Sequence, residues 1–90
     1  MRRLHLVIHG EVQGVFFRDY VRKAAYFLKL KGWVKNNEDG TVEAVAEGTN
    51  DVLQEFLTKC KHGPVLAKVT KVDVAWEDAT KEFDSFDVKH

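Results

Sequence analysis

The sequence predicts an α+β domain in which strands and helices follow the order βαββαβ. Three observations indicate this class. Several short runs alternate apolar and polar residues, and two longer segments repeat apolar residues every three or four positions. The third is the length of 90 residues, which is too short for two independent cores and predicts a single domain over residues 1–90. With 44% hydrophobic and 31% charged residues, the composition is that of a chain that buries one core.

The first predicted unit is a strand, a glycine-containing loop and a helix. Leu4, Leu6 and Ile8 alternate with more polar residues, and this strand ends at Gly10. Beyond the loop the spacing changes to that of a helical stripe, formed by Phe17, Val21, Ala24 and Leu28.

A hairpin and a second helix are predicted next. Residues 32–37 and 41–48 are extended runs, and the Asp39-Gly40 pair between them is a strong turn signal. Thr49, Asn50 or Asp51 is available to cap the second helix, which ends at Gly63 and Pro64. Its apolar face consists of Leu53, Phe56, Leu57 and Cys60.

Residues 70–77 alternate as a further strand, and residues 83–88 offer a short extra strand at the C-terminus. Together the elements predict a ferredoxin-like βαββαβ sandwich, an antiparallel sheet with two helices on one face. Alternation in 42–47 should direct Glu43 and Glu47 to the open, solvated face.

Charge and cysteine content narrow the function classes. Fourteen basic and fourteen acidic residues give zero net charge, which does not favour a nucleic acid or an anionic membrane as partner. No run approaches transmembrane length, and the N-terminal apolar stretch is too short for a signal peptide. A single cysteine excludes an internal disulfide framework, and we expect a cytoplasmic protein.

The segment GEVQGVFFR, residues 10–18, is the strongest candidate for a site. Its glycines permit positive φ angles, so backbone N–H groups can converge at the start of a helix, where anions bind. Arg18 falls in the first helical turn, which the helix dipole disfavours by roughly 0.3–1 kcal/mol. This placement is explained if its guanidinium turns back to grip a phosphate. From the loop alone, turn glycines and a solvated arginine are the competing interpretation.

The same segment resembles the signature of the acylphosphatase family, G-x-V-Q-G-V-x-F-R. The matching residues are Gly10, Val12, Gln13, Gly14, Val15, Phe17 and Arg18. A second family motif resembles Gly32, Trp33, Val34 and Asn36, followed by Gly40, Val42, Glu43, Ala44 and Gly48.

The resemblance implies hydrolysis of the carboxyl–phosphate bond of small acyl phosphates, without a metal or other cofactor. It implies that Arg18 binds the phosphoryl group, that Asn36 orients the attacking water, and that inorganic phosphate or sulfate can occupy the site. The backbone amides expected to assist Arg18 are those of Gly10, Glu11, Val12, Gln13, Gly14, Val15 and Phe16. We expect a monomer.

Several other residues have a plainer interpretation. His5 and His9 lie roughly 13 Å apart along their strand, too far to share a metal, and are expected beside Glu43 or Glu47. Cys60 is expected to be a packed thiol and Asn37 a turn residue. The family often has glycine where Lys29 stands, and residues 86–90 depart from its usual aromatic and basic ending.

Two rival functions are considered. An RNA-binding ferredoxin-like domain would need aromatic residues on its central strands and excess positive charge, and the predicted open face offers mainly histidine and glutamate. A non-catalytic anion-binding module would need Arg18 and the loop but has no use for Asn36. Related domains also occur in larger carbamoyl-transferring proteins, whereas this chain is expected to be free-standing.

Overall fold

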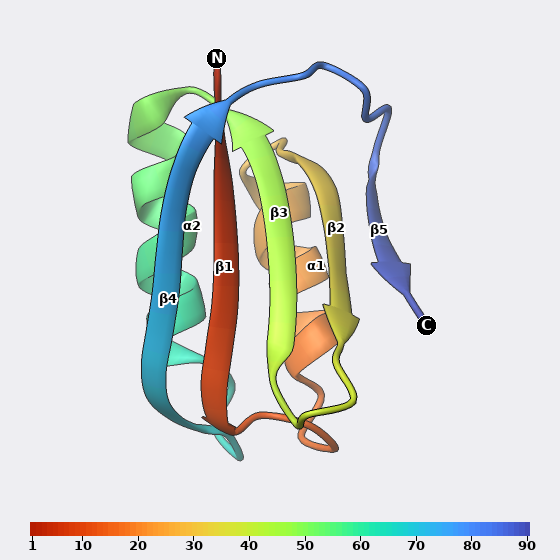
Figure 1. Ribbon diagram of the computed structural model, residues 1–90, viewed down its shortest axis with the longest axis vertical. Coiled ribbons are helices and arrows are strands. Elements are labelled where there is room, and N and C mark those ends of the chain that lie inside the picture. The colour runs from red at the N-terminus through yellow and green to blue at the C-terminus, as the bar shows by residue number, and fades with distance from the viewer.

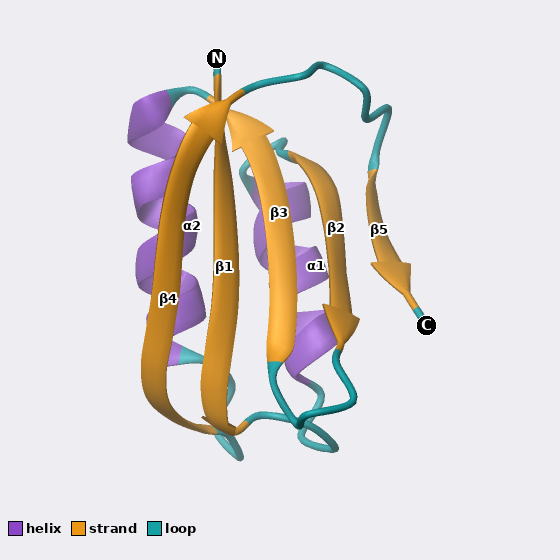
Figure 2. Ribbon diagram, in the orientation of Figure 1, coloured by secondary structure: helices purple, strands orange, loops and turns teal.

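The computed structural model describes residues 1–90, which form a five-stranded sheet with both helices on one face (Figures 1 and 2). This confirms the predicted ferredoxin-like βαββαβ order and the extra C-terminal strand. The elements are β1 (Arg2–Glu11), α1 (Phe17–Phe27), β2 (Lys31–Asn36), β3 (Val42–Gly48), α2 (Asn50–His62), β4 (Lys68–Asp78) and β5 (Phe86–Lys89).

The strands lie in the order β4-β1-β3-β2-β5. The pairs β4–β1, β1–β3 and β3–β2 are antiparallel, as predicted. β5 instead pairs parallel to β2, so the sheet is mixed. Figure 1 shows the reason: after β4 the chain crosses one end of the sheet and must then run back in the direction of β2. β5 therefore adds a strand beside β2, and the two strands finish at the same end of the sheet.

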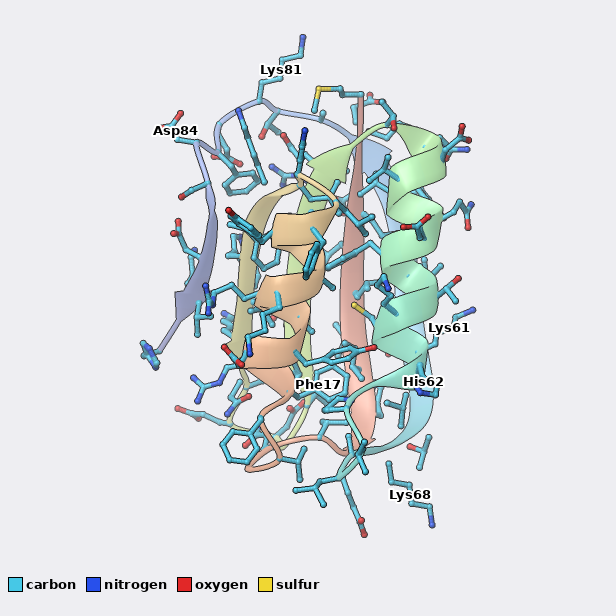
Figure 3. The ribbon with its side chains drawn as sticks, turned by 180° about the vertical axis from the view of Figure 1, so that it is seen from behind. Phe17, Lys61, His62, Lys68, Lys81 and Asp84 are labelled. Carbon is cyan, nitrogen blue, oxygen red and sulfur yellow. The ribbon has the colours of Figure 1, made fainter.

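The core lies between the sheet and the helices (Figure 3). Leu4, Leu6 and Ile8 of β1 are fully buried against the predicted helical stripes, of which only Leu28 is partly exposed. Cys60 is fully buried within this core, and its burial raises the pKa of the thiol well above the usual range. The prediction of a packed thiol is confirmed.

On the open face, Glu47 differs from its prediction. Its side chain is only 3% exposed, because the segment after β4 folds back over the end of the sheet and covers it. The carboxylate accepts hydrogen bonds from Arg3 Nε at 3.0 Å and from the backbone N–H groups of Thr80 at 2.8 Å and Lys81 at 3.0 Å. The expected solvated glutamate is instead an anchor for this segment.

The two histidines of β1 both contact carboxylates on the open face. His5 pairs with Glu43, as expected, whereas His9 pairs with Asp73 of β4 at 2.8 Å. No three His, Cys, Asp or Glu side chains come close enough together to hold a metal ion. Neither helix is both long and apolar enough to span a membrane.

Candidate active site

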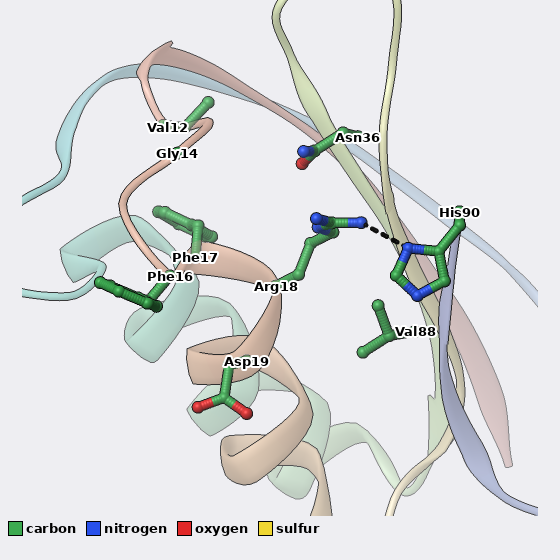
Figure 4. Close-up of a pocket in the computed structure, with 9 residues that line it drawn as sticks. All are labelled: Val12, Gly14, Phe16, Phe17, Arg18, Asp19, Asn36, Val88 and His90. Carbon is green, nitrogen blue, oxygen red and sulfur yellow. Dashed lines mark hydrogen bonds between the residues drawn. The ribbon is translucent and has the colours of Figure 1, made fainter.

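A hollow of about 410 Å³ opens where the loop after β1, the start of α1 and the ends of β2 and β5 meet (Figure 4). Elements that are far apart in the sequence therefore share one site. The residues that line it are Val12, Gly14, Phe16, Phe17, Arg18, Asp19, Asn36, Val88 and His90.

The loop enters α1 through two left-handed residues, Gly14 with φ 74° and Phe16 with φ 64°. Phe16 is the N-cap residue of α1, and its side chain cannot accept from the first-turn N–H groups. The first turn of a helix has N–H groups without intrahelical acceptors, and its dipole favours an anion. The loop and helix start therefore offer backbone donors, including those of Phe17 and Arg18, which the sequence prediction had not included.

Gly10 and Glu11, two of the predicted amide donors, belong to β1 and do not line the hollow. They pair with Val69 and Lys68 of β4, after a register shift between His9 and Gly10. A Cβ atom at Gly10 would lie 2.0 Å from the carbonyl oxygen of Lys68. The glycine is thus required by the close approach of β4.

Gln13 and Val15 support the loop without their side chains lining the hollow. Gln13 Nε2 donates to the carbonyl oxygens of Asn37 at 2.7 Å and Thr41 at 2.9 Å, and Val15 packs against the core. Asn37 also donates to Thr41 Oγ1 at 3.0 Å, so it is a turn residue, as expected. Gln13 therefore ties the loop to the β2–β3 hairpin, next to Asn36.

Asn36 is the last residue of β2, and its Oδ1 atom is buried without a hydrogen-bond donor from the protein. Its amide and the Arg18 guanidinium point toward one another across the hollow (Figure 4). A buried acceptor that lacks a donor costs roughly 1–3 kcal/mol. The hollow therefore carries an acceptor whose hydrogen-bonding capacity is unused within the protein.

No carboxylate neutralises Arg18. The adjacent Asp19 pairs with Lys23 and Arg22 at 3.1 Å each, and these side-chain hydrogen bonds lower the pKa of Asp19. Arg18 Nη1 instead contacts Nδ1 of His90 at 3.2 Å. The positive charge of the guanidinium thus faces the hollow.

Sequence reasoning placed neither Val88 nor His90 in the site, although it noted that residues 86–90 were unusual. A signal was present: Phe86, Val88 and His90 are spaced by two, as residues on one face of a strand are. Phe86 and Val88 pack against the core, and the same face brings His90 to the hollow.

An open-faced sandwich with an uncompensated arginine and free amides at a helix start defines a small α+β domain whose hollow offers donors and positive charge suited to an anion. The acylphosphatase family model matches residues 4–88. An acylphosphatase of Pelotomaculum thermopropionicum is 43% identical over 86 residues, which cover 96% of this chain and 94% of that protein. The chain belongs to the acylphosphatase family, whose members are hydrolases.

Solved structures agree with this assignment. The acylphosphatase of Bacillus subtilis superposes with a TM-score of 0.96 at 38% identity, and all of both chains is covered. A full-length HypF protein, solved in a phosphate- and nucleotide-bound form, superposes with a TM-score of 0.88 at 28% identity. The match covers all of this chain but 12% of HypF, so the same fold also occurs within a larger protein.

Proposed function

We propose that the hollow hydrolyses acyl phosphates, with Arg18 and the backbone amides around Val12–Phe16 binding the phosphoryl oxygens and Asn36 orienting the attacking water. The observation that carries this proposal is the buried Oδ1 of Asn36, which has no donor in the protein and faces Arg18 across the hollow. A water that donates to this oxygen would stand beside a phosphoryl group held by Arg18. The acceptor and the cation come from β2 and α1, which the fold places side by side.

The reaction needs little chemical assistance from side chains. Water forms a new bond to phosphorus, the bond between phosphorus and the acyl oxygen breaks, and the products are a carboxylate and dihydrogen phosphate. A carboxylic acid has a pKa near ~4, so the carboxylate leaves without a general acid. Both protons of the water end on the phosphate product.

The residues of the hollow match this requirement. Phosphoryl transfer proceeds through a loose transition state, and its catalysis consists mainly of positioning and electrostatic stabilisation. An amide side chain is too weak a base to deprotonate water, so Asn36 orients the nucleophile and the substrate's own phosphate accepts the proton. Guanidinium and backbone N–H groups supply the positive charge that metal ions supply in kinases and GTPases.

Two variants separate binding from turnover. Arg18→Gln should abolish both phosphate binding and hydrolysis, whereas Asn36→Ala should keep phosphate binding and lower kcat by about 10²-fold or more. Phosphate release from a simple acyl phosphate without added metal measures turnover, and calorimetry measures binding. Asn50→Ala, at an exposed position on α2, is the matched control. A near-normal kcat in Asn36→Ala would show that the amide does not position the water.

The same assay tests the rival anion-binding module, which would bind phosphate but release none from an acyl phosphate. It also tests substrate breadth. The hollow is small and is lined by only nine residues, so we expect similar turnover of acyl phosphates with unlike acyl groups. Strong discrimination between them would contradict this expectation.

A further inference from the structure

His90 is the one imidazole in the hollow, and β5 delivers it there from a part of the chain far from α1 and β2. Its Nδ1 lies 3.2 Å from Arg18 Nη1, and Figure 4 shows this contact between the two side chains. The contact involves the same guanidinium to which the proposed function assigns phosphate binding. His90 therefore stands where an anion held by Arg18 would reach it.

The chemistry of the contact defines the state of the imidazole. A guanidinium can donate hydrogen bonds but cannot accept them. Nδ1 of His90 must then be the acceptor, so the ring is neutral and carries its proton on Nε2. A protonated ring would have two donors and no acceptor, and it would face the arginine as a like charge.

A bound anion would change the protonation preference of the imidazole. When the anion accepts the hydrogen bonds of the Arg18 N–H groups, Nδ1 of His90 loses its donor. A proton added to Nδ1 would let the ring donate to the same anion, with opposite charges in contact. Such a charge-assisted hydrogen bond contributes about 1.5 kcal/mol or more, and this corresponds to roughly tenfold in affinity.

We propose that His90 is a second anion-binding residue of this site, and that it takes up a proton when an anion binds to Arg18. The inference rests on the proposed function for the location of the anion. Binding and protonation are then linked, so each favours the other by the same factor.

The other charged side chains near His90 each contact a different group, so His90 is the side chain left to respond to an anion on Arg18. On α1, Asp19 is held by Lys23 and Arg22. The ammonium groups of Lys35 on β2 and Lys89 on β5 lie over the ring of Trp33. The carboxylate of Asp87 accepts from Ser85 Oγ.

Sulfate is the appropriate probe, because it remains a dianion between pH 5.5 and 8, whereas phosphate groups titrate near ~6. Calorimetry at several pH values gives the affinity, and repeating it in buffers with different ionisation enthalpies counts the protons taken up. The matched variants are His90→Gln and His62→Gln. His62 is an exposed histidine at the end of α2, outside the hollow (Figure 3).

We expect sulfate to bind the unmodified protein about tenfold more tightly at pH 5.5 than at pH 8, with uptake of roughly half a proton at intermediate pH. His62→Gln should behave in the same way, whereas His90→Gln should lose the uptake and most of the pH dependence.

Two results would overturn the inference. One is sulfate binding that depends on Arg18 but whose pH dependence is unchanged in His90→Gln; this result leaves the proposed function intact. The other is sulfate binding unaffected by Arg18→Gln, which would remove the proposed phosphate site and the role of His90 together.

Discussion

Lys29 adopts a conformation that disfavours its own residue type. It has φ 57°, and it follows the end of α1 in a cap where Leu30 N–H bonds to Ala25 O and Lys29 N–H bonds to Tyr26 O. This pair of bonds is the Schellman arrangement, whose left-handed position usually carries glycine. A side chain there costs roughly 1 kcal/mol.

Replacing Lys29 by glycine should therefore stabilise the protein slightly, by up to about 0.5 kcal/mol, because the greater flexibility of glycine in the unfolded chain offsets at least half of the strain that is relieved. Urea denaturation measures the change. Lys23→Gly is the control, because Lys23 lies within α1 and glycine there should cost about 1 kcal/mol. Equal destabilisation by both substitutions would contradict the assignment of strain to Lys29.

Gln13 links the loop after β1 to the β2–β3 hairpin by two hydrogen bonds. Gln13→Leu removes both donors to the hairpin carbonyl oxygens, which should cost roughly 1–3 kcal/mol of stability. Because the hairpin follows Asn36 directly, we expect kcat to fall more than phosphate affinity. Turnover and phosphate binding, measured well below the melting temperature, distinguish this result from unfolding. Unchanged kcat in a folded Gln13→Leu variant would mean that the hairpin holds its position without this contact.

At the scale of elements, β5 depends on how the segment between β4 and β5 is held. Glu47 on β3 holds its beginning, through the N–H groups of Thr80 and Lys81. Burial alone would raise the pKa of Glu47, but these hydrogen bonds and the Arg3 guanidinium outweigh it and lower the pKa below the usual range. The folded protein therefore favours the ionised carboxylate.

This lowered pKa makes the protein sensitive to acid. A carboxyl group with a depressed folded pKa contributes its full stability above the unfolded value of about 4.3, and loses it as the pH falls through the folded value. Glu47→Gln should cost roughly 1.5–3 kcal/mol at pH 7, and the difference from the unmodified protein should shrink below pH ~4. Thermal denaturation across this range measures it, with the exposed Glu55→Gln as control. A constant difference at all pH values would contradict the role of ionised Glu47.

Local patterns predicted most elements, because each strand or helix buries one face and its apolar residues therefore recur at a regular spacing along the chain. They could not predict the direction of β5, which depends on the route of residues 79–85 across the sheet. Nor could they predict the burial of Glu47, because the residues that cover it lie more than thirty positions away. For the same reason Arg18 and Asn36 were found through motifs, whereas His90 required the assembled sheet.

At the scale of the whole molecule, the charged edge strand β4 favours a monomer over a dimer formed by pairing of two sheets. The outer strand β4 carries charged residues along its exposed edge, including Lys68, Lys71 and Asp73, and charges on an edge oppose pairing with a second sheet. The large exposed apolar residues are dispersed among the N-terminus, the loop before α1, the end of α1, the loop after α2 and a single position on β4, Val74. Light scattering coupled to size exclusion should give a mass near 10.3 kDa at micromolar concentrations. A mass near twice this value would contradict the expectation.

β1 lies between β3 and β4, and its register with β4 joins Arg2 to Asp78. This interior strand can therefore complete its hydrogen bonds only after it has met β4, a segment that lies more than fifty residues away in the sequence. Closing so long a loop consumes entropy before the pairing compensates it, and domains dominated by such distant contacts fold in milliseconds to seconds rather than microseconds. We expect this chain to be a slow folder for its size, with a rate limited by the search of β4 for β1 rather than by the formation of either helix.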